Sequence, residues 1–246
     1  MSSVELLNWM GSDLEVANAA RCSMDKESTS LSEQDVRLIR FLARGMTKSE
    51  YEQILADLTG SKDPGFIKER VKDLNVPTHW TPFSQCVAKF RITMPIFVAR
   101  QWFRHTVGVT RNEVSRRYVS NEPEFADLEW REAPDKSIKQ GSGPPIPEAS
   151  AREWELRALD AENKARRLYN EMIEDGVAPE QARAMLPQSM LTTIIETGSL
   201  AAYARICQQR LDSHAQVEVQ EVAQGVDENM RKLFPYSWAA LMGEDD

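Results

Sequence analysis

The sequence predicts a helix-rich protein with few strands, on three observations. Apolar residues recur at helical spacing over residues 151–176, which form the clearest helical pattern of the chain. Residues 190–223 are also helical in tendency, with a break near Gly198. Strand patterns are short: an apolar-rich run predicts an edge strand over 4–10, and alternation over 83–93 gives a strand with one mainly apolar face.

The amino-terminal third is expected to consist mostly of helices. Apolar spacing predicts a helix over residues 13–22. Ser32 is a candidate N-cap, with Asp35 in the position of a capping-box acid, for a helix that Gly45 ends. Residues 48–74 carry two further helical patterns, separated by a glycine and a proline.

Prolines mark the boundaries of the later elements. Pro95 suits the first position of a helix that continues to Phe103, and a polar motif follows at the end of that helix and in the loop beyond it. Residues 122–150 are rich in proline, glycine and charge, which predicts a long loop with at most one strand. Pro179 begins a short helix that Pro187 ends.

Composition limits the class of protein. A chain of 246 residues with 41% hydrophobic and 28% charged residues is typical of a soluble globular protein with one core. No apolar run approaches the roughly 18 to 20 residues that cross a bilayer, and no secretory signal is evident. The three cysteines are widely spread, which favours a reducing, cytoplasmic location. A net charge of −8 disfavours nonspecific binding to nucleic acid.

The most polar motif consists of two neighbouring segments. Residues 100–105 read Arg-Gln-Trp-Phe-Arg-His, and residues 112–118 read Asn-Glu-Val-Ser-Arg-Arg-Tyr. Arginine binds phosphate through two parallel hydrogen bonds, and aromatic and amide groups suit a ring. The pattern indicates a site for an anionic, ring-bearing ligand. The alternative is a surface helix with exposed arginines.

Other polar groups have weaker signals. Arg183 precedes Met-Leu-Pro and is either a ligand contact or a solvated helix residue. Residues 210–216 place polar side chains in an otherwise apolar helix, which indicates a ligand or subunit contact, or a structural network. The three histidines lack metal-ligand spacing, so no metal site is expected, and the cysteines suit inert buried positions. These patterns indicate a protein that binds a phosphorylated aromatic ligand.

Several separated segments resemble, in order, the flavin-dependent thymidylate synthases. The similarity covers Asn-Ala-Ala-Arg-Cys-Ser at 18–23, His-Trp-Thr-Pro-Phe at 79–83, the signature region at 95–118, Ala-Arg-Ala-Met-Leu-Pro at 182–187, and Arg-Leu-Asp-Ser-His-Ala-Gln-Val-Glu at 210–218. Together these segments span most of the chain. Residues 47–76 lie outside them and resemble an inserted helical segment.

The resemblance implies an α+β fold that is helix-rich with a small central antiparallel sheet, formed by residues 1–246 as a single domain. It also implies a homotetramer with active sites between subunits. The expected reaction is methylation of dUMP to dTMP, with methylenetetrahydrofolate as carbon donor, FAD as hydride source and NADPH as its reductant. No cysteine of the enzyme attacks the pyrimidine in this family.

Matching positions imply the roles of single residues. Arg210 would polarise the pyrimidine by stabilising negative charge on its ring. The nucleotide would contact Gln101, Arg104, Glu113, Ser115, Arg117, Arg183 and Arg210. FAD would contact Thr81, Arg104, His105, Glu113, Ser199, Arg205 and His214, with His79 near flavin and folate.

The chain departs from the family signature at Thr106, where a third arginine is usual, and in one extra residue before Asn112. Arg111 is a candidate to restore the missing charge. These departures leave three alternatives open: C5 methylation or hydroxymethylation of dCMP, hydroxymethylation of dUMP, and a non-catalytic nucleotide-binding protein.

Overall fold

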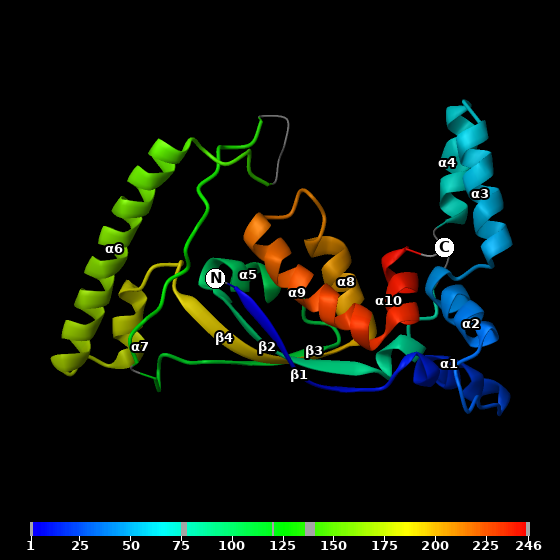
Figure 1. The fold of residues 1–246 in the computed structure, drawn as a ribbon, viewed down its shortest axis with the longest axis horizontal. Coiled ribbons are helices and arrows are strands. Elements are labelled where there is room, and N and C mark those ends of the chain that lie inside the picture. Colours follow the sequence, from blue (N-terminus) through cyan, green and yellow to red (C-terminus); the bar gives the residue numbers. More distant parts are fainter. Residues whose placement is uncertain (1, 75–77, 120, 136–140, 245–246) are drawn as a thin grey trace. The chain divides into compact units, whose positions relative to one another are not determined.

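The computed structural model describes residues 2–74, 78–119, 121–135 and 141–244 (Figure 1). The described residues are 54% helical with a small antiparallel sheet, which confirms the predicted fold class. Among the described residues, the strands are β1 (Ser3–Met10), β2 (Val87–Pro95), β3 (Val109–Glu113) and β4 (Leu191–Ser199). The helices are α1 (Asp13–Arg21), α2 (Glu33–Arg44), α3 (Lys48–Gly60), α4 (Pro64–Asp73), α5 (Ile96–Trp102), α6 (Glu148–Glu174), α7 (Pro179–Ala182), α8 (Leu200–Arg210), α9 (Val217–Leu233) and α10 (Pro235–Met242). None of the described helices is long and apolar enough to span a membrane.

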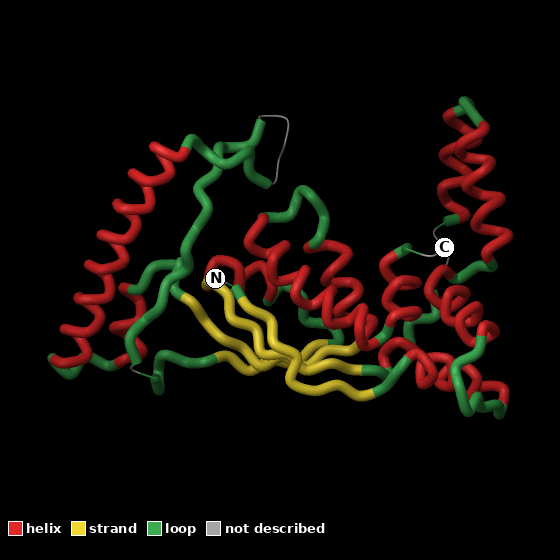
Figure 2. The backbone as a smooth tube through the Cα atoms, in the orientation of Figure 1, coloured by secondary structure: helices red, strands yellow, loops and turns green. Residues whose placement is uncertain are grey.

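The strands pair in the order β1-β2-β4-β3, and Figure 2 shows them side by side in yellow. The predicted apolar face of the second strand is confirmed, because Ala88, Phe90 and Ile92 are fully buried. This strand begins at Val87, later than predicted. The residues before it include a short 3₁₀ turn at Pro82–Ser84.

Strand β4 corrects the prediction of a continuous helical region over 190–223. Its residues alternate between partly and fully buried, and Ile194 and Glu196 are among the fully buried ones. The segment reads Leu-Thr-Thr-Ile-Ile-Glu-Thr-Gly-Ser, and its β-branched residues favour a pleated strand over a helix. The helical tendency is correct only from Leu200 onward.

Two further elements were not predicted. Strand β3 lies in the segment expected to be a loop, and α10 begins at Pro235. The predicted strand at 4–10 and the helices at α1 to α7 are confirmed with shifts of a few residues at their ends. In the described part of 122–150, the only pairings are isolated bridges of Phe125 with Met190 and of Arg131 with Pro145, in agreement with a long loop.

The chain divides into two compact units. Unit 1 comprises Met1–Asn8, Lys89–Thr197 and Ile206–Asp227, and unit 2 comprises Trp9–Ala88, Gly198–Arg205 and Glu228–Asp246. Helices α3 and α4 of unit 2 occupy most of the segment 47–76, of which residues 75 and 76 lie outside the described residues. That the whole chain forms a single domain stays a prediction.

In unit 2, a buried carboxylate fastens the segment before α2. Ser32 and Asp35 form the predicted capping box, and Gly45 ends the helix at a φ of 75°. The Asp35 carboxylate also accepts hydrogen bonds from Arg21 at 2.8 Å and from Ser28 at 3.0 Å. Asn18 bonds both the backbone N–H and the carbonyl of Ser28. The motif at 18–23 therefore supplies an ion pair and an amide clamp that order this segment.

Candidate functional site

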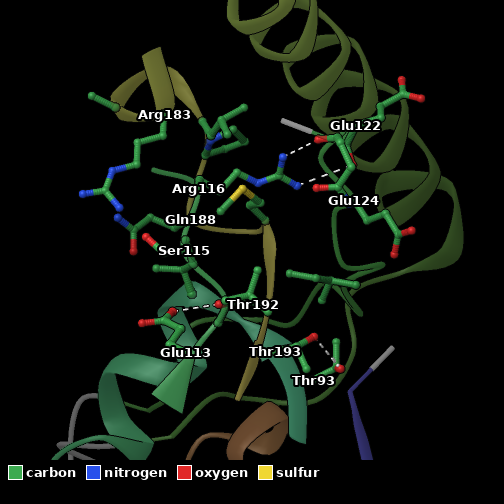
Figure 3. Close-up of a pocket in the computed structure, with 18 of the residues that line it drawn as sticks. Thr93, Glu113, Ser115, Arg116, Glu122, Glu124, Arg183, Gln188, Thr192 and Thr193 are labelled. Atoms are coloured by element: carbon green, nitrogen blue, oxygen red, sulfur yellow. Dashed lines mark hydrogen bonds between the residues drawn. The ribbon is translucent and has the colours of Figure 1, made fainter. Parts of the chain in front are cut away.

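Unit 1 contains a cavity of about 750 Å³ beside the end of β3 (Figure 3). Residues from β2, α5, β3, β4, α7 and the turn after α7 contribute to its walls, together with Asn121, Glu122 and Glu124. The lining residues are Thr93, Ile96, Arg100, Glu113, Val114, Ser115, Arg116, Asn121, Glu122, Glu124, Glu180, Arg183, Ala184, Leu186, Pro187, Gln188, Met190, Leu191, Thr192 and Thr193.

Three of the predicted nucleotide contacts line this cavity: Glu113, Ser115 and Arg183. The carboxylate of Glu113 accepts a hydrogen bond from the buried Thr192 hydroxyl at 2.7 Å, which fixes its position on the cavity wall. The Ser115 hydroxyl accepts from a backbone N–H at 3.3 Å. The Arg183 side chain is exposed and donates through Nε to the carbonyl of Glu180 at 3.3 Å. This side of the cavity offers a guanidinium and a hydroxyl to an anion.

Arg116 lines the cavity, although the motif analysis assigned a role to Arg117 instead. The guanidinium of Arg116 donates to the carbonyls of Asn121 and Glu122. Arg117 forms an ion pair with Glu180, its Nε 3.2 Å from Oε2 of the carboxylate. Both arginines lie in the turn after β3, where no regular periodicity indicates which of two neighbouring side chains faces the cavity.

The cavity also contains groups for which the family resemblance implied no role. Arg100 is exposed and lies in the polar motif, so its type and position were visible in the sequence. Thr93 and Thr193 join neighbouring strands through a 2.9 Å hydrogen bond between hydroxyls. Their pairing depends on the order of β2 and β4, which local periodicity does not reveal.

A second cluster in unit 1 surrounds Arg210. Its Nε donates to Nε2 of His105 at 2.9 Å, and its Nη2 donates to the carbonyl of Gln101 at 3.0 Å. Burial lowers the pKa of Arg210, because the charged form loses water. The Gln101 side chain donates to Gln216. Of the predicted ligands near this cluster, Arg104 has an exposed side chain at the end of α5.

Beneath this cluster lies a buried ion pair. The carboxylate of Glu196 has no exposed surface and accepts from Nε1 of Trp102 at 3.0 Å and from Nε of Arg111 at 2.6 Å. Nη2 of Arg111 donates to the carbonyl of His105 at 2.6 Å, and its guanidinium lies 5.0 Å above the ring centroid of Phe103. Arg111 is therefore bound to protein groups and does not line the cavity described above.

Two predicted cofactor contacts lie in unit 2 just before β2. The His79 ring stacks on Phe41 of α2 with centroids 5.8 Å apart, and its backbone N–H donates to the carbonyl of Leu42 at 2.9 Å. Thr81 is exposed and precedes the 3₁₀ turn. The Thr-Pro segment is thus anchored to α2 through His79.

The remaining predicted cofactor contacts lie around α8 and after it. In unit 2, the Ser199 hydroxyl accepts from the backbone N–H of Ala202 at 3.2 Å at the start of α8, and Arg205 is exposed on that helix. In unit 1, His214 is exposed in the turn before α9, and its ring nitrogen lies 2.9 Å from a carboxylate oxygen of Asp212. Hydrogen bonds from the backbone and ring of His214 lower the pKa of Asp212.

No cysteine is among the described residues that line the cavity. Cys86 and Cys207 are buried and Cys22 is exposed, and none of the three lines the cavity. Burial raises the pKa of the Cys86 thiol to about 11, so the reactive thiolate is scarce at neutral pH. The described lining of the cavity therefore supplies no thiol.

Comparisons with known proteins agree with this architecture. Residues 5–236 match the family model described as "Thymidylate synthase complementing protein". The flavin-dependent thymidylate synthase of Thermus thermophilus is 31% identical over 240 residues, which are 97% of this chain and 74% of that protein. That of Thermosipho africanus is 33% identical over 74% of this chain and 80% of its own length. In structure, the UMP/dUMP methylase PolB from Streptomyces cacaoi, bound with 5-Br dUMP, superposes with a TM-score of 0.75 at 23% identity, covering 99% of this chain and 95% of PolB.

Proposed function

Because the chain belongs to the family of flavin-dependent thymidylate synthases, we propose that this enzyme methylates C5 of dUMP to give dTMP. Methylenetetrahydrofolate would donate the carbon, and NADPH would reduce the flavin. The observation that carries the proposal is the content of unit 1: a cavity whose wall offers a guanidinium and a hydroxyl, and, in the same unit, a partly buried arginine with two fixed acceptors.

The nucleotide phosphate is proposed to bind at the wall formed by Arg183 and Ser115. Arg183 retains two terminal nitrogens that no described hydrogen bond uses, and such a planar group matches two phosphate oxygens at once. Arg100, exposed on the same cavity, adds a second cation. The carboxylate of Glu113, held by Thr192, is suited to accept from a sugar hydroxyl or a ring N–H.

Arg210 is the proposed catalytic residue. A guanidinium has donors only and stays charged, so it can stabilise negative charge that develops on a pyrimidine ring. Its partial burial strengthens that interaction, because less water screens the charge. The bonds to His105 and to the carbonyl of Gln101 fix its orientation before substrate binds. No enzyme thiolate is required in this scheme, in accord with the buried Cys86.

FAD is the proposed cofactor, and each unit has donor groups of the type that binds it. In unit 1, Arg104 exposes a guanidinium of the type that binds a pyrophosphate. In unit 2, Arg205 exposes another, and Thr81 and Ser199 add hydroxyls. The stacked ring of His79 presents an aromatic edge of the type found beside flavin and folate rings. When bound and reduced, the flavin supplies the hydride that completes the methyl group.

The base and the product remain to be tested against alternatives. The name of PolB includes both UMP and dUMP, so UMP is a further candidate substrate for this protein. Methylation or hydroxymethylation of dCMP and hydroxymethylation of dUMP would use the same carbon position. A non-catalytic relative would bind nucleotide without turnover.

We therefore propose three measurements on the purified protein. Flavin absorbance after incubation with FAD should show uptake, and a protein that takes up no FAD would exclude the flavoenzyme. Mass analysis of the nucleotide product should show an added methyl group; an added hydroxymethyl group would favour the alternative. Arg210→Ala should keep its fold and bind flavin but lose turnover. The control is Arg37→Ala, at a side chain that is 71% exposed on α2, which should keep the fold, the bound flavin and the turnover.

A homotetramer is the proposed assembly. Helix α6 has 27 residues, yet Tyr169 is its only buried residue within the chain. Its apolar side chains Trp154, Leu156 and Leu159 are each about half exposed, which is typical of a surface that another protein covers. Light scattering coupled to gel filtration should give four times the mass of the 28.0 kDa chain. A monomer at micromolar concentration would contradict this assembly.

A further inference from the structure

Glu196 is a buried charge, and two of its partners, Trp102 and Arg111, lie beside the residues that hold Arg210. Its carboxylate lies on β4 with no exposed surface. A buried carboxylate is unfavourable unless it is paired and hydrogen-bonded. Glu196 meets that condition through Trp102 at 3.0 Å and Arg111 at 2.6 Å. Neither contact involves the cavity, so Glu196 acts on other residues of the protein.

Arg111 connects this carboxylate to the turn that follows α5. One nitrogen of its planar guanidinium bonds Glu196, and another bonds the carbonyl of His105 at 2.6 Å. The Phe103 ring covers one face of the same guanidinium. Glu196 therefore holds the end of α5 directly at Trp102, and it holds the turn after α5 at His105 through Arg111.

Both described acceptors of Arg210 lie in the same few residues. Its Nε donates to the His105 ring and its Nη2 donates to the carbonyl of Gln101. The positions of these two acceptors set the direction of the guanidinium. A displacement of the turn would therefore move both acceptors together.

We propose that Glu196 is a positioning residue for Arg210: through Trp102 and Arg111 it fixes residues 101–105, the end of α5 and the turn after it, whose imidazole and carbonyl aim the catalytic guanidinium. This inference rests on the proposed function of Arg210. It also explains the place of Arg111, which was a candidate for the missing signature arginine and instead pairs with Glu196.

The arrangement determines the protonation of His105. Arginine has no acceptor, so the His105 Nε2 atom must accept the bond from Arg210. The ring is then neutral and carries its proton on Nδ1. This is the less common form of free histidine, which prefers the proton on Nε2. The Nδ1–H form of His105 thus reports whether the turn and Arg210 are correctly aligned.

The test combines nitrogen NMR of ring-¹⁵N histidine with steady-state kinetics. The chain has three histidines, and His105 is assigned from the signals lost in His105→Asn. Glu196→Gln keeps an acceptor for Trp102 but removes the charge that holds Arg111. The matched control is Glu5→Gln, which removes the carboxylate from an ion pair with Arg91 whose side chains are 58% and 49% exposed.

In the wild-type protein and in Glu5→Gln, His105 should carry its proton on Nδ1. In Glu196→Gln the His105 signals should shift toward the Nε2–H form, and kcat should fall about 10-fold or more with KM for dUMP within about twofold. Unshifted His105 signals, or an unchanged kcat, in folded Glu196→Gln would overturn the proposal.

A second variant keeps the proposal testable if Glu196→Gln does not fold. Arg111→Lys leaves a cation beside Glu196 but lacks the planar fork that also reaches His105. It should produce the same shift, and an unshifted His105 in this variant would equally overturn the proposal. The NMR measurement needs no turnover. If the wild-type protein fails to methylate dUMP, the proposed function fails while the His105 signals still decide the role of Glu196.

Discussion

Replacing Asp35 with Asn should destabilise unit 2 in a manner that depends on pH. Burial by itself raises the pKa of this carboxyl, but hydrogen bonds from Ser32, Arg21 and Ser28 outweigh burial and lower the pKa from 3.8 to about 2. Because the pKa is lower in the folded state, the carboxylate stabilises the fold above its unfolded pKa. This contribution is lost as the pH falls through about 2.

The shift in pKa gives the size of the effect. It corresponds to about 2 kcal/mol of folding free energy at neutral pH, of which roughly half remains at pH 3. Asp35→Asn keeps the shape of the side chain and removes its charge. The variant should therefore lose about 2 kcal/mol at pH 7, or about 4 to 8 °C in Tm for a chain of this size.

Urea unfolding at pH 7, 5, 4 and 3 measures this difference. The difference in free energy of unfolding between wild type and Asp35→Asn should be constant from pH 7 to 5 and decrease by about 1 kcal/mol toward pH 3. Glu33→Gln, at a carboxylate that is 93% exposed in the first turn of α2, should show neither effect. A gap of the same size at every pH would refute the role of the Asp35 charge.

Three other changes test separate parts of the structure. Arg183→Ala should raise KM for dUMP about 10-fold or more with little change in kcat, because it removes a charged hydrogen bond to the phosphate; an unchanged KM would contradict that contact. Gly11→Ala should lower the free energy of unfolding by about 2 kcal/mol or more in urea unfolding, since the backbone has a φ of +100° and the new Cβ would lie 2.4 Å from Sγ of Cys86. Gly60→Ala, whose new Cβ would have no neighbouring atom within 4 Å, should leave the free energy of unfolding unchanged. A thiol reagent at pH 8 should label Cys22 quickly and Cys86 only on unfolding, because burial raises the pKa of Cys86 to about 11; equal rates would contradict this.

Local patterns predicted the elements whose signals lie within a few residues. The capping box of Ser32 and Asp35 and the glycine after α2 were visible in the sequence, because they act over three or four positions. The alternating face of β2 was predicted for the same reason. Strand β4 was mistaken for a helix, since an apolar segment before a true helix extends the helical pattern. Its β-branched composition was the missed signal.

The site was predictable in its residue types and not in its pairings. The polar motif contained Glu113 and Ser115 of the cavity, and also Gln101 and His105, which accept the hydrogen bonds of Arg210. Whether Arg116 or Arg117 faces the cavity depends on the course of the chain after β3, which was expected to be a loop. The ion pair of Arg111 with Glu196 joins positions 85 residues apart, so sheet pairing and not local spacing brings them together.

The most direct test of the proposed chemistry is tritium release from the pyrimidine ring. Purified protein with FAD, NADPH and methylenetetrahydrofolate is incubated with C5-tritiated dUMP or C5-tritiated dCMP, because substitution at C5 must release the label. Release from dUMP, with little or none from dCMP and none without the folate, is the predicted result. Release from dCMP alone would assign a different base, and release from neither nucleotide would contradict methyl transfer by this protein.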